Sequence, residues 1–267
     1  ELHALCALTI AEPIAMNVIF HEKYYHTYES DPAAAPGRME PIIRELKQHP
    51  DYRFITPAPA TSTDILQAHS RRHIDYIKQD PIVYEMALLA AGGAIKAAEL
   101  ACAGEPSFAC IRPPGHHASF DSAWGFCFFN NMAVSLLKLK MEGRITSAFI
   151  LDFDLHTGDG NINILLKHDG LTILNPRSHT EEDYLKEVEA ELAKAGDFDI
   201  VAASAGFDEY VKDWGQKLST NAYRTIGALL KDFSEKHCRG RRYALLEGGY
   251  YHQDLGINVH AFCEGFR

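Results

Sequence analysis

The sequence predicts an α/β fold in which helices cover both faces of a mostly parallel β-sheet. Short apolar segments alternate with longer stretches of helical periodicity along the 267 residues, and this alternation is typical of βαβ units. The apolar segments are unbroken rather than alternating with polar residues, as expected for strands buried on both faces. Polar residues among glycines follow four of these segments, and ligands bind at such positions in open parallel sheets.

Seven segments have the length and composition of strands. In chain order they are 16–20, 52–56, 107–111, 146–153, 171–174, 198–204 and 242–246. The stretches with a helical pattern are 40–48, 81–103, 129–141, 180–194 and 219–237. We find no internal repeat, low-complexity tract or linker, so residues 16–267 are expected to form a single domain. Residues 1–15 are interpreted as an N-terminal extension, or as a remnant that precedes the native start.

The composition is that of an ordinary globular protein, with 46% hydrophobic and 23% charged residues. A formal net charge of −10 and the shortness of the basic clusters disfavour a nucleic-acid-binding face. The six cysteines are irregularly spaced without a C-x-x-C pair, which favours reduced thiols and a cytoplasmic location. The apolar N-terminal stretch lacks a basic n-region and is interrupted by Glu12 and Pro13, so neither a signal peptide nor a membrane span is predicted.

The segment LDFDLHTGDG predicts a metal site. Asp152, Asp154 and His156 recur at every second residue, so on an extended segment their side chains share one face. A divalent cation would remove the repulsion between the carboxylates, and Asp208 in SAGFD is a further ligand candidate from another strand exit. One imidazole and two carboxylates with an open position are typical of catalytic zinc. Asp152 is interpreted as a carboxylate that orients a histidine rather than as a ligand.

The segment RPPGHHASFDSAWGFCFFNN places adjacent histidines in a bent stretch beside aromatic residues. Hydrolysis at a metal site requires a base for the water and an acid for the leaving amine. His116 and His117 are the candidates for these roles. Each needs a carboxylate that fixes its tautomer, and Asp152 and Asp159 are close enough along the chain to serve.

A donor for negative charge that develops on a substrate carbonyl is expected in EGGYY. The Gly-Gly pair would expose the hydroxyl of Tyr250, and Tyr251 is an alternative. A cysteine hydrolase that uses Cys127 and a nearby histidine is also conceivable. A cysteine within an aromatic run is more typical of a buried core, which disfavours that mechanism.

Taken together, these segments resemble the zinc-dependent histone deacetylase superfamily, which includes acetoin-utilisation proteins and acetylpolyamine amidohydrolases. The resemblance runs from about residue 17 to the C-terminus and rests on RPPGHHA, GFCFFNN, DFDLHTGDG, SAGFD and EGGYY, with PGRME and ALLAAGGAIKAAE in support. It implies the arginase–deacetylase fold, a three-layer αβα arrangement around a central sheet of about eight strands. Residues 16–267 would then be one deacetylase-like catalytic domain. The implied reaction is the zinc-dependent removal of an acetyl or other acyl group from an acylated amine such as acetyl-lysine or acetylpolyamine.

The resemblance also implies the composition of the metal centre. Zinc would be held by Asp154, His156 and Asp208, and ferrous iron is an alternative because the ligand types suit both ions. Potassium bound by main-chain oxygens around Asp152, Asp154 and His156 is a further implied cofactor.

The remaining site residues follow from motif positions in the same way. His117 would act as general base and then as acid, with Asp159 orienting it. His116, paired with Asp152, would be its electrostatic partner, and Tyr250 would bind the substrate carbonyl. The residues implied in substrate binding are Gly125, Phe126 and Gly249, and Arg38 would lie at the back of the site.

The chain departs from the family pattern in three places. Thr157 stands where a second histidine often follows the ligand histidine. The interval between His156 and Asp208 is short, and NPRSHTEEDY at 175–184 occupies the place of the loop that forms one wall of the family's tunnel. We therefore expect a pocket that is unusually open, or one that is completed by another subunit.

Two other functions are left open by the sequence. An arginase-like ureohydrolase with two manganese ions would need G-G-D-H and D-A-H-x-D segments, which we do not find. A non-catalytic relative would bind acylated ligands without turnover. The expected partner of the deacetylase is an acylated amine substrate, either a small molecule or a protein lysine, with no nucleic acid and no membrane, and a homo-oligomer is compatible with the sequence.

Overall fold

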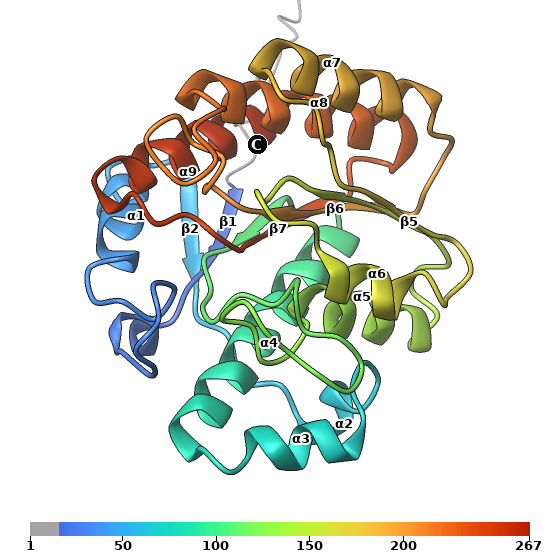
Figure 1. The fold of residues 1–267 in the computed structure, drawn as a ribbon. Coiled ribbons are helices and arrows are strands. Elements are labelled where there is room, and N and C mark those ends of the chain that lie inside the picture. The colour runs from blue at the N-terminus through green and yellow to red at the C-terminus, as the bar shows by residue number, and fades with distance from the viewer. Residues whose placement is uncertain (1–15) are drawn as a thin grey trace, which may run out of the picture.

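Seven parallel strands form one central sheet in the order β2-β1-β3-β7-β6-β4-β5 (Figure 1). The structure is a computed structural model that describes residues 16–267, so the interpretation of residues 1–15 lies outside the described part. The strands are β1 (Met16–Ile19), β2 (Tyr52–Ile55), β3 (Ser107–Ala109), β4 (Ala148–Asp152), β5 (Leu171–Leu174), β6 (Ile200–Ala205) and β7 (Arg242–Leu246).

All seven segments that the sequence predicts as strands are strands, and their parallel pairing is confirmed. The eighth strand implied by the resemblance has no counterpart in the sheet among residues 16–267.

The helices cover both faces of the sheet, so the three-layer arrangement is confirmed (Figure 1). One layer contains α1 (Met39–Leu46), α7 (Glu181–Lys194), α8 (Thr220–His237) and α9 (His252–Phe266). The other contains α4 (Pro81–Cys102), α5 (Asn131–Met141) and α6 (Asp159–Leu165), with the short α2 (Ser62–Ile65) and α3 (Arg71–Ile77) outside α4. A 3-10 turn, η1 (Glu22–Tyr25), follows β1.

All five predicted helices are present, whereas α2, α3, α6 and α9 were not predicted. The failure at α9 has a clear cause, because Gly256 and Gly265 weaken its helical pattern. A Cβ at Gly256 would lie 2.3 Å from the Pro41 carbonyl oxygen of α1, and one at Gly265 would lie 2.1 Å from that of Arg224 in α8. The glycines therefore permit close packing between helices, which a local pattern does not reveal.

One helix among the described residues, α4, is long and apolar enough to cross a membrane by length and composition. Its most apolar window is 67% buried within the fold, and it packs against α5 and the strands β1, β3 and β7. The side chain of Asp80 caps its first turn by accepting from the N–H groups of Ile82 and Val83. These contacts are those of a core helix.

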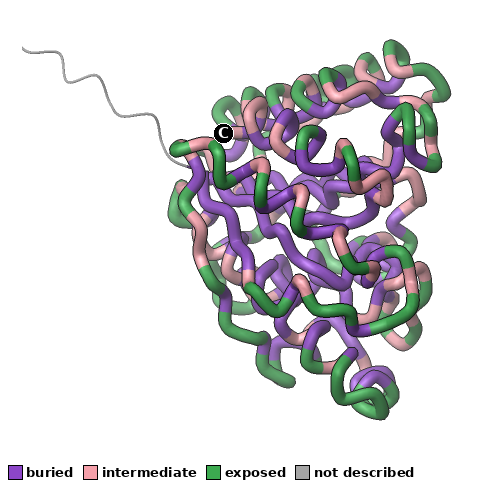
Figure 2. Tube along the Cα trace, turned by 90° about the vertical axis from the view of Figure 1, so that its left-hand side faces the viewer, coloured by how far each residue is buried: buried purple, intermediate pink, exposed green. Residues whose placement is uncertain are grey.

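The four polar segments lie together because their strands are neighbours in the middle of the sheet. The strands β3, β7, β6 and β4 are adjacent and parallel, so the chain leaves each of them at the same edge. Figure 2 shows how buried the central part of the chain is, and every residue of β3, β4, β6 and β7 is buried. The segments 110–130, 247–251, 206–219 and 153–158 therefore meet at the carboxyl edge of the sheet.

Two buried histidines fasten the loop between β3 and α5. His69 donates from Nδ1 to the carbonyl oxygen of Ser119 at 2.9 Å and accepts at Nε2 from the N–H of Asn130 at 2.8 Å. His73 contacts the carbonyl oxygen of Phe128 through Nε2 at 2.7 Å. Burial, together with the nearby His73, lowers the pKa of His69 to about 3. The ring is therefore a neutral link that holds the loop in place.

Candidate active site

Asp154, His156 and Asp208 form a cluster at the exits of β4 and β6, as the sequence suggests. Each offers one ligand atom, and these three atoms lie within 4.8 Å of one another. Both carboxylate side chains are almost completely buried, whereas the imidazole of His156 is 40% exposed. The N–H of Gly248 donates to Oδ2 of Asp154 at 2.8 Å.

The approach of Gly248 to this cluster leaves no room for a side chain. A Cβ at this position would lie 2.6 Å from Oδ2 of Asp154 and 2.7 Å from Oδ2 of Asp208. The resemblance implies substrate binding by Gly249, whereas the structure places Gly248 on the cavity lining. The carbonyl of Gly249 is directed toward Arg38, whose Nε donates to it at 2.9 Å.

The charges of the cluster fit a divalent cation. Burial and the neighbouring charge of Asp154 raise the pKa of Asp208 to about 7, and Oδ2 of Asp208 is buried without a hydrogen-bond partner. The carboxylates of Asp154 and Asp208, each with an oxygen 3.4 Å from Nδ1 of His156, raise the pKa of His156 to about 10. The carboxylates thus favour positive charge at this point, and a bound cation would supply that charge while leaving the imidazole neutral. The donor set of one nitrogen and two carboxylates suits a divalent metal ion.

His116 is a buried imidazole held between two carboxylates. Its Nδ1 lies 3.3 Å from Oδ2 of Asp152, and its Nε2 lies 3.6 Å from Oδ1 of Asp154. Burial disfavours the charged ring, yet Asp154 and Asp152 outweigh burial and raise the pKa of His116 well above its usual value. Asn161 donates to Oδ2 of Asp152 at 3.0 Å and so helps to fix this pair.

His117 has a different environment, which keeps its ring neutral. Its Nδ1 contacts Oδ1 of Asp159 at 2.6 Å. Burial and the adjacent charge of His116 lower the pKa of His117 to about 4, against the opposing effect of Asp159. The two neighbouring histidines therefore have pKa values that are shifted in opposite directions, which is typical of an acid–base pair.

Trp124 was not identified from the sequence, although it contacts both members of the His117–Asp159 pair. Its indole ring lies over the imidazole with the ring centroids 3.9 Å apart. Its Nε1 donates to Oδ2 of Asp159 at 2.9 Å. Asp159 therefore accepts from an imidazole at one oxygen and from an indole at the other.

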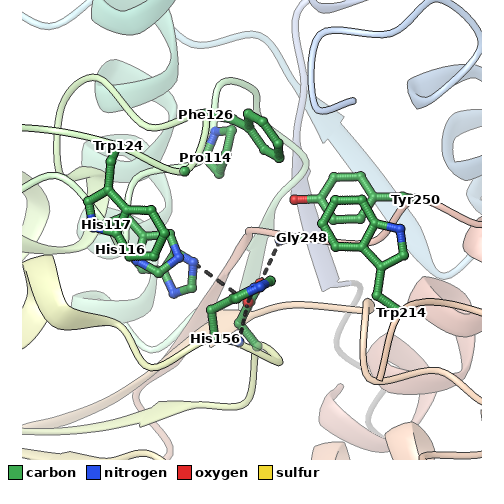
Figure 3. Close-up of a pocket in the computed structure, with 11 residues that line it drawn as sticks. Pro114, His116, His117, Trp124, Phe126, His156, Trp214, Gly248 and Tyr250 are labelled. Atoms are coloured by element: carbon green, nitrogen blue, oxygen red, sulfur yellow. Dashed lines mark hydrogen bonds and ion pairs between the residues drawn. The ribbon is translucent and has the colours of Figure 1, made fainter. Parts of the chain in front are cut away.

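Gly125 explains how the histidine and the aromatic wall fit together. Its φ of +59° is in the left-handed region, and a Cβ at this position would lie 2.4 Å from Cδ2 of His117. Phe126 follows with a φ of +65°, which is strained for a bulky residue. This backbone directs the Phe126 ring to the cavity wall (Figure 3).

Glu247 is another residue for which the sequence predicted no role. It follows β7 directly and is fully buried. Its Oε2 accepts from the N–H groups of Gly115 and His116 at 2.7 and 3.2 Å, and burial raises its pKa to about 7. Arg38 donates to its carbonyl oxygen. These contacts join the β3 and β7 exits beneath the histidine pair.

Tyr250, rather than Tyr251, faces the cavity (Figure 3). Burial raises the pKa of Tyr250 well above its usual value, so the phenol stays protonated and can donate. The hydroxyl of Tyr251 donates to Gln253 instead, at 2.9 Å. The turn is fixed by Asp213, whose Oδ2 accepts from the N–H groups of Tyr250 and Tyr251 at 2.6 and 2.7 Å.

Asp154, His156, the two histidines of the pair and Tyr250 line one cavity of about 110 Å³. Its aromatic residues are Phe126, Tyr250, Trp124 and Trp214. Phe126 and Trp214 both contact the Tyr250 ring, edge-on and stacked respectively. Trp214, from the loop after β6, is a lining residue that the sequence did not indicate (Figure 3).

Cys127 does not have the properties of a nucleophile. It is buried, and burial together with the charge of Glu247 raises its pKa well above the usual value. Its Sγ accepts from the N–H of His117 at 3.4 Å. The thiol is therefore a packing residue, as the aromatic run around it predicts.

The family model described as "Histone deacetylase domain" matches residues 33–184 and 173–266. A probable deacetylase of Archaeoglobus fulgidus is 29% identical and covers 87% of this chain and 80% of its own. The histone deacetylase-like amidohydrolase of Pseudomonas aeruginosa is 27% identical, covering 82% of this chain and 74% of its own.

Two further relatives bear on substrate and fold. The zebrafish (Danio rerio) protein named polyamine deacetylase HDAC10 is 27% identical over 91% of this chain, which spans 46% of that protein. The crystal structure of the HDA15 HD domain superimposes with a TM-score of 0.83 at 22% identity, over 94% of this chain and 89% of that one. The structural likeness shows the shared fold.

The chain belongs to the histone deacetylase domain family, and by class it is a deacetylase, a hydrolase. Membership of this family favours a deacetylase over the arginase-like ureohydrolase that the sequence left open. The metal ion, the substrate and the role of each residue are the subject of the proposal below.

Proposed function

We propose that the protein is a zinc-dependent amidohydrolase that removes a short acyl group from an acylated primary amine, such as acetyl-lysine or an acetylpolyamine. The observation that carries this proposal is the joint position of three groups in one cavity. These are the cluster Asp154–His156–Asp208, the pair His117–Asp159 and the Tyr250 hydroxyl. Together they meet the requirements of amide hydrolysis for an activated water, a proton carrier and an oxyanion donor.

Zinc held by Asp154, His156 and Asp208 would polarise the acyl carbonyl and lower the pKa of water. Ferrous iron suits the same donors. Potassium near Asp152 stays a prediction from the resemblance.

His117 is proposed as the proton carrier. Asp159 holds the proton on Nδ1, which leaves Nε2 free to accept a proton from water as its oxygen attacks the acyl carbon. Because the pKa of His117 is lowered to about 4, the ring is neutral before the reaction and ready to act as a base. The same ring then donates that proton to the amine nitrogen as the C–N bond breaks. Water and amide are thereby converted into a carboxylic acid and an amine, and transfer of the acid's proton to the amine gives the carboxylate and the ammonium ion.

His116 and Tyr250 are proposed to stabilise charge without carrying the proton. Asp152 and Asp154 keep His116 protonated, so a fixed positive charge lies beside His117 and disfavours a second imidazolium until negative charge develops on the substrate. The Tyr250 hydroxyl would donate to the carbonyl oxygen at that stage. Removal of one such donor typically lowers kcat by about 10²–10³-fold.

The physiological setting is also part of the proposal. Each cysteine among the described residues is buried as a free thiol, which is consistent with a reducing compartment, and we place the protein in the cytoplasm. The substrate would be a small acylated amine or a protein lysine, without a nucleic-acid or membrane partner.

The test is the hydrolysis of a fluorogenic acetyl-lysine amide by protein stripped of metal and reloaded with one equivalent of zinc. Turnover should appear with zinc and be lost in His117→Ala. Metal binding without turnover, on either acetyl-lysine or an acetylpolyamine, would favour the non-catalytic alternative. A lack of metal binding would refute the proposed metal centre.

A further inference from the structure

We infer that Glu45, His49 and His260 form a second zinc site, which fastens α1 to α9. Each of the three residues offers one ligand atom, and these atoms lie within 4.8 Å of one another. Two imidazoles and one carboxylate are a donor set that zinc accepts, and a water molecule can complete a tetrahedral shell. The site is separate from the proposed catalytic centre, and the inference does not depend on the proposed function.

Close packing between the two helices brings these residues together. Gly256 of α9 lies directly against α1, because a Cβ at this position would be 2.3 Å from the carbonyl oxygen of Pro41 and 3.2 Å from Cβ of Glu45. His260 follows Gly256 by one helical turn and therefore lies on the same side of α9. Glu45 and His49 are also one turn apart, with Oε1 and Nε2 separated by 3.6 Å.

The two imidazoles lie face to face, with ring centroids 3.8 Å apart and an interplanar angle of 13°. Two charged rings would repel each other at this distance, and burial together with the neighbouring His49 lowers the pKa of His260. The neutral imidazole is the form that binds a metal ion. Both rings are only half-buried, so a modest rotation of each can direct one nitrogen toward a shared ion.

Each imidazole also has a nitrogen available for a metal ion. Nδ1 of His260 lies 3.0 Å from the hydroxyl oxygen of Tyr52, which leaves Nε2 as the ligand atom. Histidines that bind metal usually have the other nitrogen hydrogen-bonded in this way, since that bond fixes the tautomer. Nε2 of His49 is a buried atom for which residues 16–267 provide no hydrogen-bond partner. Buried polar atoms are rarely left in this state, and a bound ion would satisfy this nitrogen.

The site should bind zinc more weakly than the catalytic cluster does. It has one carboxylate where the catalytic cluster has two, and the side chains of His49 and Glu45 are 35% and 27% exposed. Glu264 lies one turn beyond His260 but pairs with Arg224 at 2.7 Å, so it is not counted as a ligand. We therefore expect the first equivalent of zinc to occupy the catalytic cluster, and zinc at the second site to be removed by dialysis against metal-free buffer.

The ion would connect two helices that both begin beside the active site. α1 begins directly after Arg38, and α9 begins two residues after Tyr250. Arg38 donates to the carbonyl oxygen of Gly249 at 2.9 Å. The second site lies just beyond the end of α1 and in the second half of α9, so an ion there would hold the helix pair together without contacting the reacting groups.

The experiment starts from protein that has been reloaded with one equivalent of zinc and measures the binding of further zinc by equilibrium dialysis. The wild type should bind about one further equivalent, whereas His49→Gln and His260→Gln should bind almost none. Further zinc should also raise the midpoint of thermal unfolding of the wild type, by about 5–10 °C at about one hundred times the dissociation constant. The midpoint of each variant should not change. These measurements do not require turnover, so a failure of the proposed amidohydrolase would leave them decisive.

His237→Gln is the matched control. The side chain of His237 is 35% exposed, like that of His49, and its Nδ1 pairs with Asp197 at 2.9 Å. Its ring packs on Phe233 and not on a second imidazole, so this variant should bind the further equivalent as the wild type does. The inference is overturned if the wild type binds no further zinc, if His49→Gln binds as much as the wild type, or if His237→Gln loses as much as His49→Gln.

Discussion

Asp213→Asn is the substitution that tests how the Tyr250 hydroxyl is positioned. The two oxygens of Asp213 accept from three backbone N–H groups, those of Trp214, Tyr250 and Tyr251. An asparagine has one carbonyl oxygen, so its NH₂ group must face at least one of these donors. A hydrogen bond to a charged group contributes about 1.5–3 kcal/mol, and a buried N–H without an acceptor costs about 1–3 kcal/mol. We expect the free energy of unfolding to fall by about 2–4 kcal/mol.

The effect on catalysis should arise through Tyr250. Loss of an oxyanion donor lowers kcat by about 10²–10³-fold. A hydroxyl that is displaced but still present should cost less than this, so we expect kcat of Asp213→Asn to fall by about 10–10²-fold. In a Tyr250→Phe background the same substitution should have almost no further effect, because the hydroxyl it positions is absent. The assays are acetyl-lysine hydrolysis and urea unfolding.

Asp64→Asn is a suitable control for loss of stability without a change at the site. Asp64 is as buried as Asp213 at 7% exposure, and it caps α2 and pairs with Lys138. It should lower the free energy of unfolding and leave kcat unchanged. The reasoning about Asp213 is refuted if Asp213→Asn leaves kcat near the wild-type value, or if its effect is the same with and without the Tyr250 hydroxyl.

Three further predictions concern the loop, its buried histidine and the metal. Gly125→Ala should lower kcat by about 100-fold or more, because the added Cβ would displace the His117 ring. Gly143→Ala is the control: Gly143 has a similar positive φ, but no atom lies within 4 Å of the added Cβ, so kcat should be unchanged. Equal kcat values for the two variants would contradict the proposed clash. The pKa of His69 is 6.5 in the unfolded chain and about 3 in the folded protein, so the unfolded state takes up the proton first as the pH falls. The free energy of unfolding should therefore decrease between pH 6.5 and pH 3, by up to about 1.4 kcal/mol per pH unit. His69→Gln, which does not titrate, should flatten that part of the urea-unfolding profile, and parallel profiles would count against this account. Asp208→Asn should reduce bound zinc to well below one equivalent by elemental analysis, and full occupancy would exclude Asp208 as a ligand.

Much of the site could be anticipated from the sequence because its residues lie directly after apolar strands. Asp154, His156 and Asp208 are within one or a few residues of β4 and β6, so their convergence follows once the strands are parallel and adjacent. The histidine pair and its carboxylates are also separated by short intervals that one βα unit can bridge. In these cases the local pattern already contains the geometry.

Other parts of the site depend on contacts between segments that carry no motif. Trp214 and Asp213 lie in a loop whose sequence gives no periodicity, and their position beside Tyr250 follows from the adjacency of β6 and β7. The choice of Gly248 over Gly249 as the cavity residue likewise depends on the distance between the turn and two carboxylates.

The fold class, the seven strands and the candidate metal ligands can be predicted from local sequence patterns, because burial and hydrogen-bonding requirements act on residues that are near in the chain. The aromatic wall, the anchoring of Tyr250 and the presence of α9 become visible only in the folded molecule. Each of these results from packing between residues far apart in the chain. The helical pattern of α9 is weakened by the same glycines that let it approach its neighbours, so its stability comes from packing and not from propensity.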